Sequence, residues 1–240
     1  MSVSVRRVRA IFRKELREYR HNRSLIVGMA ILPLVFIIQP LIAVLGLTAT
    51  ASSPLGDEHV LLYMLGIPIL VPVIVAASAV AGERQQGTLE PALTTPIRRD
   101  EFLLGKALAA FLPSLAIAYA VYAVFLVLVV LFAQEGIAFA LIRGPDLLAQ
   151  VLFTPLLAAW SIWVGIAVST RSSDARVAQQ VGLLVSVPPV VVVVLIALNV
   201  ITATLGLALG CAALLLVLDV LGWRITSRLF DRERLVTGTR

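Results

Sequence analysis

Long apolar runs alternate with short charged segments along this chain of 240 residues. A bilayer core of about 30 Å needs roughly 20 apolar residues in a helix, and six runs are close to that length or longer. Within them, Asp219 near the end of the last run is the one Lys, Arg, Asp or Glu. The pattern predicts six transmembrane helices, at about 25–47, 60–81, 107–132, 147–168, 177–198 and 203–221.

Composition favours a membrane protein over a soluble domain, because 60% of the residues are apolar and 14% are charged. We expect an all-α polytopic membrane protein with an amphipathic interfacial helix at 1–24, a transmembrane domain at 25–221 and a basic cytoplasmic tail at 222–240. Ala49-Thr50-Ala51 resembles a signal cleavage site. The apolar run before it exceeds the signal core of about 7 to 15 residues, so the first span is expected to remain.

The cations are distributed unevenly between the two sides of the membrane that this topology defines. One side carries 19 Lys and Arg residues, and the other carries Arg143 alone. Because cytoplasmic loops retain Lys and Arg during insertion, both termini and the segment 82–106 are expected in the cytoplasm. The net charge of +6 is then explained by cations beside anionic lipid headgroups, without nucleic acid as a partner.

The first 24 residues have the pattern of an amphipathic helix. Apolar residues recur at spacings of three and four, and arginines follow the same spacing one residue later. The apolar positions are Val5, Val8, Phe12, Leu16 and Tyr19, and the cationic ones are Arg6, Arg9, Arg13, Arg17 and Arg20. The helix is expected to lie in the inner membrane interface before the chain turns near Asn22 or Ser24. A solvated helix that only anchors the topology is the alternative.

The segment 82–106 concentrates eight charged residues between two uncharged spans. Gly87 permits a sharp turn, and Thr88 can cap a short helix that begins at Leu89, with Glu90 in its first turn. Pro91 is tolerated in that first turn, and the helix is expected to end before Pro96, because a residue before proline avoids the α region.

A second helix is predicted to follow in the same segment, with Asp100 as its N-cap and Glu101 in its first turn. It is expected to run through Gly105 and Lys106 into the third span. The segment therefore reads as a helix, a break and a second helix at the cytoplasmic surface.

These residues resemble the segment that marks permeases of the ABC-2 type of ABC transporter. The resemblance rests on Glu83, Gly87-Thr88-Leu89-Glu90, Leu93, Thr95-Pro96, Glu101, Leu104 and Gly105-Lys106. It extends to Phe12–Arg23, which looks like the helix that leads into the membrane in that family, and to Phe230, Arg232, Glu233 and Leu235 in the tail. With six spans and both ends inside, it covers nearly the whole chain.

The resemblance implies a permease subunit in the plasma or inner membrane, usually an exporter. It implies a second permease copy or homologue and a separate cytoplasmic ATPase subunit that holds ATP and Mg²⁺. The coupling element would comprise Glu83, Gly87, Thr88, Leu89, Glu90, Thr95 and Pro96. The short link at Asn199–Thr202 departs from larger family members, which place re-entrant helices there.

The chain lacks the sequence signals of an enzyme. Two glycines at Gly82 and Gly87 are spaced as in a phosphate-binding loop, but Thr88 stands where the lysine would be and no soluble strand precedes it. His21 and His59 fall on opposite sides of the membrane, so they predict no metal cluster. We expect no cofactor in this chain.

Polar residues within the spans are candidates for a pathway or for helix contacts, and helix contacts are the commoner use. These candidates are Gln39, Gln150, Gln179 and Gln180. Asp219 lies close to Trp223 and Arg224, which favours a solvated carboxylate at the interface over a functional intramembrane charge. Cys211 stands alone in an apolar run and is expected to be a buried structural thiol. Pro188-Pro189 is expected to break the fifth span, for gating or only for packing.

Two other function classes remain open at this stage. An ion-gradient-driven secondary transporter usually places ionisable groups near the midplane, and no such group is evident here. A non-transporting membrane assembly subunit needs neither an energy source nor a pathway. The scarcity of charge along the spans favours an apolar or amphipathic cargo over a small ion.

Overall fold

The computed structural model describes residues 4–45, 60–88, 97–133 and 145–229. Within these ranges the secondary structure is helical, with turns and no strand. The helices are α1 (Val5–His21), α2 (Arg23–Leu45), the 3₁₀-helix η2 (Val60–Leu65), α4 (Gly66–Gln85), α6 (Arg99–Phe132), α8 (Pro145–Arg171), α9 (Ala175–Val185), α10 (Val187–Ala197) and α11 (Leu205–Leu229).

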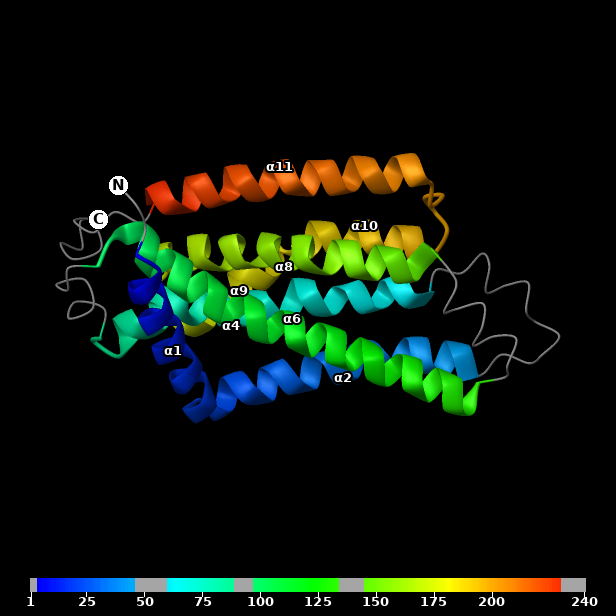
Figure 1. The fold of residues 1–240 in the computed structure, drawn as a ribbon, viewed down its shortest axis with the longest axis horizontal. Coiled ribbons are helices and arrows are strands. Elements are labelled where there is room, and N and C mark those ends of the chain that lie inside the picture. The colour runs from blue at the N-terminus through cyan, green and yellow to red at the C-terminus, as the bar shows by residue number, and fades with distance from the viewer. Residues whose placement is uncertain (1–3, 46–59, 89–96, 134–144, 230–240) are drawn as a thin grey trace.

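Six helical segments of the described chain are long and apolar enough to cross a membrane. They are Leu25–Leu45, Leu61–Gln85, Arg99–Phe132, Asp146–Arg171, Ala175–Ala197 and Leu205–Arg228. They run side by side, and α1 lies obliquely across one end, which we call the α1 end (Figure 1). The predicted all-helical membrane fold with six spans is confirmed.

The helices of two spans extend beyond the apolar runs that predicted them. α4 continues past Ala81 to Gln85, and α6 begins at Arg99 and runs through Gly105 and Lys106 into the third span, as predicted. Both extensions contain charged residues that bond to protein partners at the α1 end, so these helices need not stop where the apolar runs stop. An apolar run therefore gives the minimum length of such a helix.

The fifth span is broken, as the paired prolines predict. Ser186 separates α9 from α10, and Pro188 and Pro189 lie in the first turn of α10, where missing backbone N–H groups are tolerated. Beyond α10 the chain turns at Asn199, whose φ is 57°, and Thr204 caps α11 through its hydroxyl, which accepts from Leu207 N at 3.2 Å. No helix of its own occupies the described link from Leu198 to Thr204.

α4 is the central helix of the bundle and packs against α2, α6, α8 and α9. Its apolar side chains point in all directions, which is the pattern of a fully enclosed helix. α8 packs closely against α4 at Gly165, where a Cβ would lie 2.7 Å from the Cβ of Ala76. One turn further, the Ser169 hydroxyl accepts from the backbone of Val80 and Ala81 at 3.0 and 2.9 Å.

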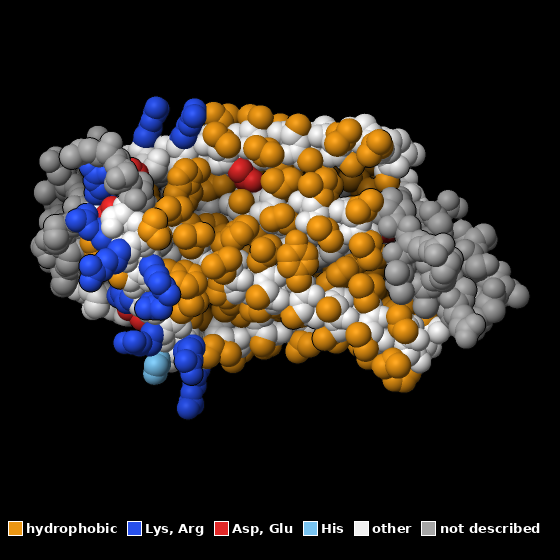
Figure 2. All heavy atoms as spheres, in the orientation of Figure 1, with side chains coloured by type: hydrophobic (Ala, Val, Ile, Leu, Met, Phe, Trp, Pro, Cys, Tyr) orange, Lys and Arg blue, Asp and Glu red, His pale blue; other side chains and the backbone are white. Residues whose placement is uncertain are grey.

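The face of the bundle shown in Figure 2 carries a broad band of apolar side chains, whereas Lys and Arg gather at the α1 end. α11 is the least enclosed candidate span. In its apolar stretch of 18 residues 6% are buried, compared with 83% for the span that contains α4. The bundle therefore has a tightly packed centre and a loosely attached sixth span.

α1 is joined to α6 by a close contact at Gly105. A Cβ on Gly105 would lie 2.7 Å from Ile11 and 3.3 Å from the Val8 carbonyl, so only glycine leaves room for α1 at this separation. Val8 and Ile11 are buried in the contact. Part of the apolar face of α1 therefore packs against α6 and not against lipid.

We expect Gly105→Leu to push α1 away from α6 and to lower the free energy of unfolding by about 1 to 3 kcal/mol, as overpacking usually does. The measurement is the thermal unfolding midpoint of the purified protein in detergent. Gly210→Leu is the matched control, because nothing lies within 4 Å of a Cβ at that helical position. Equal midpoints for the two variants would contradict the tight contact.

Candidate functional site

α4 ends at the α1 end in a glycine turn. Gly87 has a φ of 68°, its N–H donates to Arg84 O at 3.2 Å, and Thr88 N donates to Glu83 O at 3.0 Å. These two bonds form the Schellman motif, so the sharp turn predicted at Gly87 is confirmed. The Thr88 hydroxyl also lies 3.4 Å from Glu83 O and so helps to close α4. The short helix that Thr88 was expected to cap, predicted from Leu89 onward, falls outside the described residues.

The N-terminus of α6 differs from the prediction. Arg98 is the N-cap, and Asp100 lies inside the first turn, so the capping role expected of Asp100 is wrong. Glu101 provides the cap instead, because its carboxylate accepts from the backbone N–H of Arg98 at 3.1 Å. The same carboxylate accepts from Ser4 N at 2.8 Å and from the Arg7 guanidinium at 3.3 Å. Glu101 therefore joins the start of α1 to the start of α6.

Lys106 carries a buried ammonium group between three helices. Its Nζ donates to Glu15 Oε1 of α1 at 2.7 Å and to the Ala79 carbonyl of α4 at 2.8 Å, and lies 3.1 Å from Glu83 Oε1. It also lies 5.0 Å from the centroid of the Phe102 ring. Because a buried charge is costly without partners, these contacts explain why Lys106 can be 1% exposed.

A second lysine approaches the same carboxylates from the surface. Lys14 Nζ lies 2.6 Å from Glu83 Oε1, 3.1 Å from Glu18 and 3.6 Å from Glu15. Burial lowers the pKa of Lys14, but the hydrogen bond to Glu83 and the nearby carboxylates hold the pKa above its ordinary value. We call Lys14, Glu15, Glu18, Glu83 and Lys106 the Lys106 cluster.

The Lys106 cluster is better described as an ion-pair network than as a metal site. Carboxylate oxygens of Glu15, Glu18 and Glu83 lie within 4.8 Å of one another, close enough to bind a cation. Two ammonium groups already pair with these carboxylates: Lys14 lies within 4 Å of all three, and Lys106 pairs with Glu15 and Glu83. Glu83 Oε2 is a buried carboxylate oxygen without a hydrogen-bond partner in the described chain, so the network is not fully satisfied.

Arg84 connects the end of α4 to the end of α8. Its guanidinium donates to the carbonyls of Ser172 at 2.6 Å and Thr170 at 3.2 Å. Thr170 lies in the last turn of α8 and Ser172 directly follows its last residue, Arg171, so these carbonyls lack helical partners and a cation is favourable there. The α1 end therefore holds α1, α4, α6 and α8 together through charged side chains.

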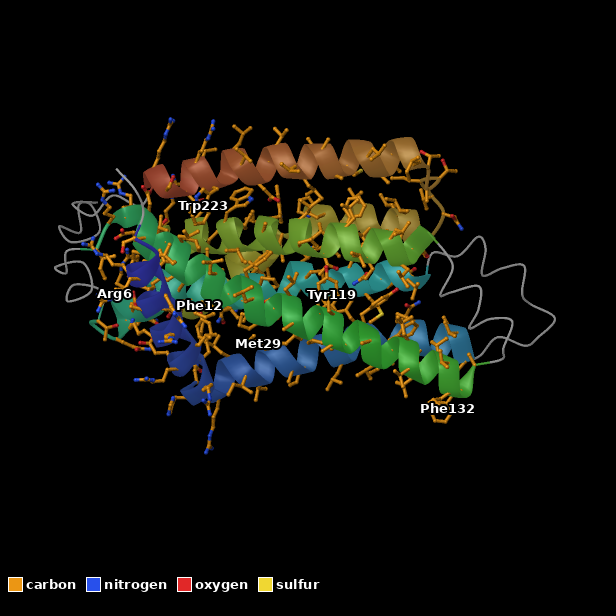
Figure 3. All side chains as sticks on the ribbon, viewed as in Figure 1. Arg6, Phe12, Met29, Tyr119, Phe132 and Trp223 are labelled. Carbon is orange, nitrogen blue, oxygen red and sulfur yellow. The ribbon has the colours of Figure 1, made fainter. Side chains whose placement is uncertain are left out.

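α1 presents two different surfaces. Arg6, Arg9, Arg13, Arg17 and Arg20, the expected cationic flank, are all exposed. Of the expected apolar positions, Val8 is buried, Phe12, Leu16 and Tyr19 are half-buried, and Val5 is exposed. Arg6 and Phe12 lie on α1 at this end of the bundle, whereas Phe132 ends α6 at the other (Figure 3). Asn22 follows α1 as its C-cap, where the turn was expected.

The predicted coupling residues are only partly described. Glu83, Gly87 and Thr88 lie together at the end of α4, and Glu83 belongs to the Lys106 cluster. Leu89, Glu90, Thr95 and Pro96 lie outside the described residues, as do the tail residues from Phe230 onward, Arg143 and His59. The sequence analysis missed Ile11, Glu15 and the burial of Lys106. Glu15 follows Val8 and Ile11 at spacings of seven and four, so its position on the packed face was a detectable signal.

The polar residues of the spans have different surroundings. Gln39 and Gln180 are exposed on the bundle surface, and Gln179 donates to the Ile74 carbonyl of α4 at 3.2 Å. Gln150 is buried, and its amide atoms have no partner in the described chain. Gln179 thus makes a helix contact, and a pathway role for any of the four stays a prediction.

Two expectations for α11 are wrong. Asp219 is not a solvated carboxylate, because Oδ1 accepts from the Trp163 indole at 3.2 Å and Oδ2 is buried. Gly222 lets α11 approach the ring of Trp163, which places Asp219 against α8. Cys211 is not buried but partly exposed, since α11 packs loosely along that part of its length.

Comparison with known proteins places the chain in a family. A family model described as "ABC-2 family transporter protein" matches residues 9–223, which include most of α1, five of the candidate spans and most of the sixth. No curated protein matches the chain.

We expect Lys106→Met to destabilise the protein by about 3 to 5 kcal/mol, because it removes the nearest cation from the buried carboxylate of Glu15 and one of two cations from that of Glu83. The check is the free energy of unfolding in detergent. Lys106→Met combined with Glu15→Gln should recover part of the loss, and Lys14→Met should cost less because Lys14 is half-exposed. A double variant as unstable as the sum of both single variants would contradict the pairing.

Proposed function

We propose, because the chain belongs to the ABC-2 family of transporter proteins, that it is the permease subunit of an ATP-driven exporter. In this proposal a separate cytoplasmic ATPase subunit binds ATP and Mg²⁺, and the chain supplies the membrane path together with a second permease copy or homologue. The family match over 9–223 and the six apolar helices support the transport class.

The proposed orientation has both termini and the α1 end in the cytoplasm of a plasma or inner membrane. It is supported by the concentration of Lys and Arg at that end (Figure 2) and by the positive-inside rule. In this orientation the exposed arginines of α1 face anionic headgroups, while Phe12 and Leu16 face the acyl boundary. α1 is then an interfacial helix held by lipid on one face and by α6 on the other.

The Lys106 cluster is the observation that carries the coupling hypothesis. The predicted coupling segment joins the end of α4 to the start of α6, and Lys106 joins both helices to α1 through Glu83, Ala79 and Glu15. A force on the segment therefore reaches three helices as a unit, because displacing any one of them separates buried charges.

ATP-driven closure of the partner subunits would move this unit. A ligand can shift an equilibrium between two conformations only by its difference in affinity for them, so ATP must bind one conformation of the assembled transporter more tightly. In this hypothesis Glu83, Gly87, Thr88, Leu89, Glu90, Thr95 and Pro96 form or support the contact with the ATPase. The turn at Gly87 directs the chain away from α4 toward that contact.

We expect Leu89→Ala and Glu90→Lys to reduce co-purification of the ATPase subunit and to remove the coupling of its vanadate-sensitive ATP hydrolysis. Expression and membrane insertion should be unchanged, because both residues lie outside the apolar spans. Arg176→Gln is the control, as Arg176 is exposed at the same end but belongs neither to the coupling segment nor to the Lys106 cluster. A secondary transporter or an assembly subunit would show no such dependence on these residues.

Reporter fusions test the orientation independently. A reporter inserted after Arg98 should be active in the cytoplasm, and one after Asp57 should be active on the opposite side. This result follows from the cation distribution of 19 against one. The reverse pattern would refute the orientation without bearing on the family assignment.

A further inference from the structure

An apolar cavity of about 490 Å³ lies between α8, α10 and α11, in the half of the bundle away from α1. Its α11 wall extends from Leu205 to Leu218. At 1.5 Å per residue this wall is about 20 Å long, which is somewhat more than the roughly 15 Å of one hydrocarbon leaflet. The cavity therefore extends along the bundle over the depth of a leaflet.

The cavity arises because α11 is attached unevenly. Toward the α1 end, Asp219 and Gly222 contact Trp163 of α8. Toward the other end, the side of α11 that faces α8 and α10 lines the cavity, at Leu205 and Ala208. α11 thus contacts the bundle in its second half and leaves a space beside its first half.

The lining identifies the chemistry of an occupant. Almost all of the lining side chains are aliphatic or aromatic, and the charged residue Asp146 lies in the first turn of α8. Water is a poor occupant, because a buried water needs two to four polar partners. An empty apolar space of this size is also unfavourable, since its lining atoms lose their dispersion contacts. A hydrocarbon chain satisfies both conditions.

The cavity is open to the hydrocarbon phase of the membrane. Val192 of α10 and Leu209 and Leu214 of α11 line it, and they are 42%, 59% and 59% exposed. The same side chains therefore face the cavity and the lipid. We propose that this cavity binds one acyl chain of a bilayer phospholipid from the leaflet away from α1. The bound chain fills the space beside α11 that no described helix fills, and it holds α11 against α8 and α10.

Trp160 lines the cavity and supplies the test. The full chain, with any co-purifying partner, is placed in bilayer discs whose phospholipids carry bromine on the acyl chain, which quenches tryptophan on contact. The Trp160→Phe variant gives the contribution of Trp160 to the emission. We expect strong quenching of Trp160 in the parent protein, and loss of most of it in Ala208→Phe, which fills the cavity from α11.

Ala213→Phe is the matched control, because Ala213 is exposed on the same helix and does not line the cavity. It should leave the quenching of Trp160 unchanged. Ala149→Phe fills the cavity from α8 and should reproduce Ala208→Phe, which guards against misfolding of one variant. Native mass spectrometry should show one fewer retained phospholipid per chain in both cavity variants than in the control.

Three outcomes would overturn the proposal. The first is equal quenching of Trp160 in Ala208→Phe and Ala213→Phe. The second is an oxidative cross-link between Cys211 residues of two chains that Ala208→Phe abolishes, which would place a second copy over the cavity. The third is release of the bound chain when ATP and the ATPase subunit are added, which would make the occupant a cargo. The first two results stand whether or not the coupling hypothesis is correct, and the third requires that the ATPase subunit acts on this chain.

Discussion

The burial of the Lys106 ammonium is the constraint on which the arrangement of the α1 end depends. A cation enclosed at 1% exposure has to find anions and carbonyls in fixed positions, and here they come from α1 and α4. Gly105, one residue earlier, removes the side chain that would keep α1 at a distance. Gly105 thus leaves room for α1 to approach α6, and Lys106 requires the carboxylate of Glu15 on α1 as a partner. Together these two residues determine where α1 lies.

The same bundle is rigid at one end and loosely packed along one side. α4 is enclosed by four helices, and its C-terminal turns are hydrogen-bonded to the end of α8 through Ser169 and Arg84. α11 contacts the rest mainly through α8, with Asp219 and Gly222 against Trp163. A membrane protein can tolerate this asymmetry because lipid solvates apolar surfaces that water would not. Motion that begins at the α1 end would therefore move α1, α4 and α6 together, with α11 following least directly.

Much of the fold could be predicted from the sequence, because span number depends on length and apolarity alone. The helix break near Pro188 and the turn at Gly87 were predictable too, since each residue restricts or permits particular backbone angles. The span ends were less predictable: Glu83 and Lys106 look like markers of an aqueous loop until their partners are known. Glu15 pairs with Lys106 across 91 positions of sequence, and no local pattern reveals such a contact. The cap at Glu101 was mistaken for one at Asp100 because both acids suit a first turn.

The break at Ser186 has a consequence for biogenesis. α9 and α10 have 11 residues each, so each helix is about 16 Å long, roughly half the thickness of the hydrocarbon core. Neither half could be recognised alone by the insertion machinery as a membrane segment. The two must therefore enter the bilayer as one continuous apolar stretch, and the kink becomes a property of the assembled bundle. The topology of the nascent chain is then set before the helix bends at the prolines, because the bend forms only when the other helices have packed against this span.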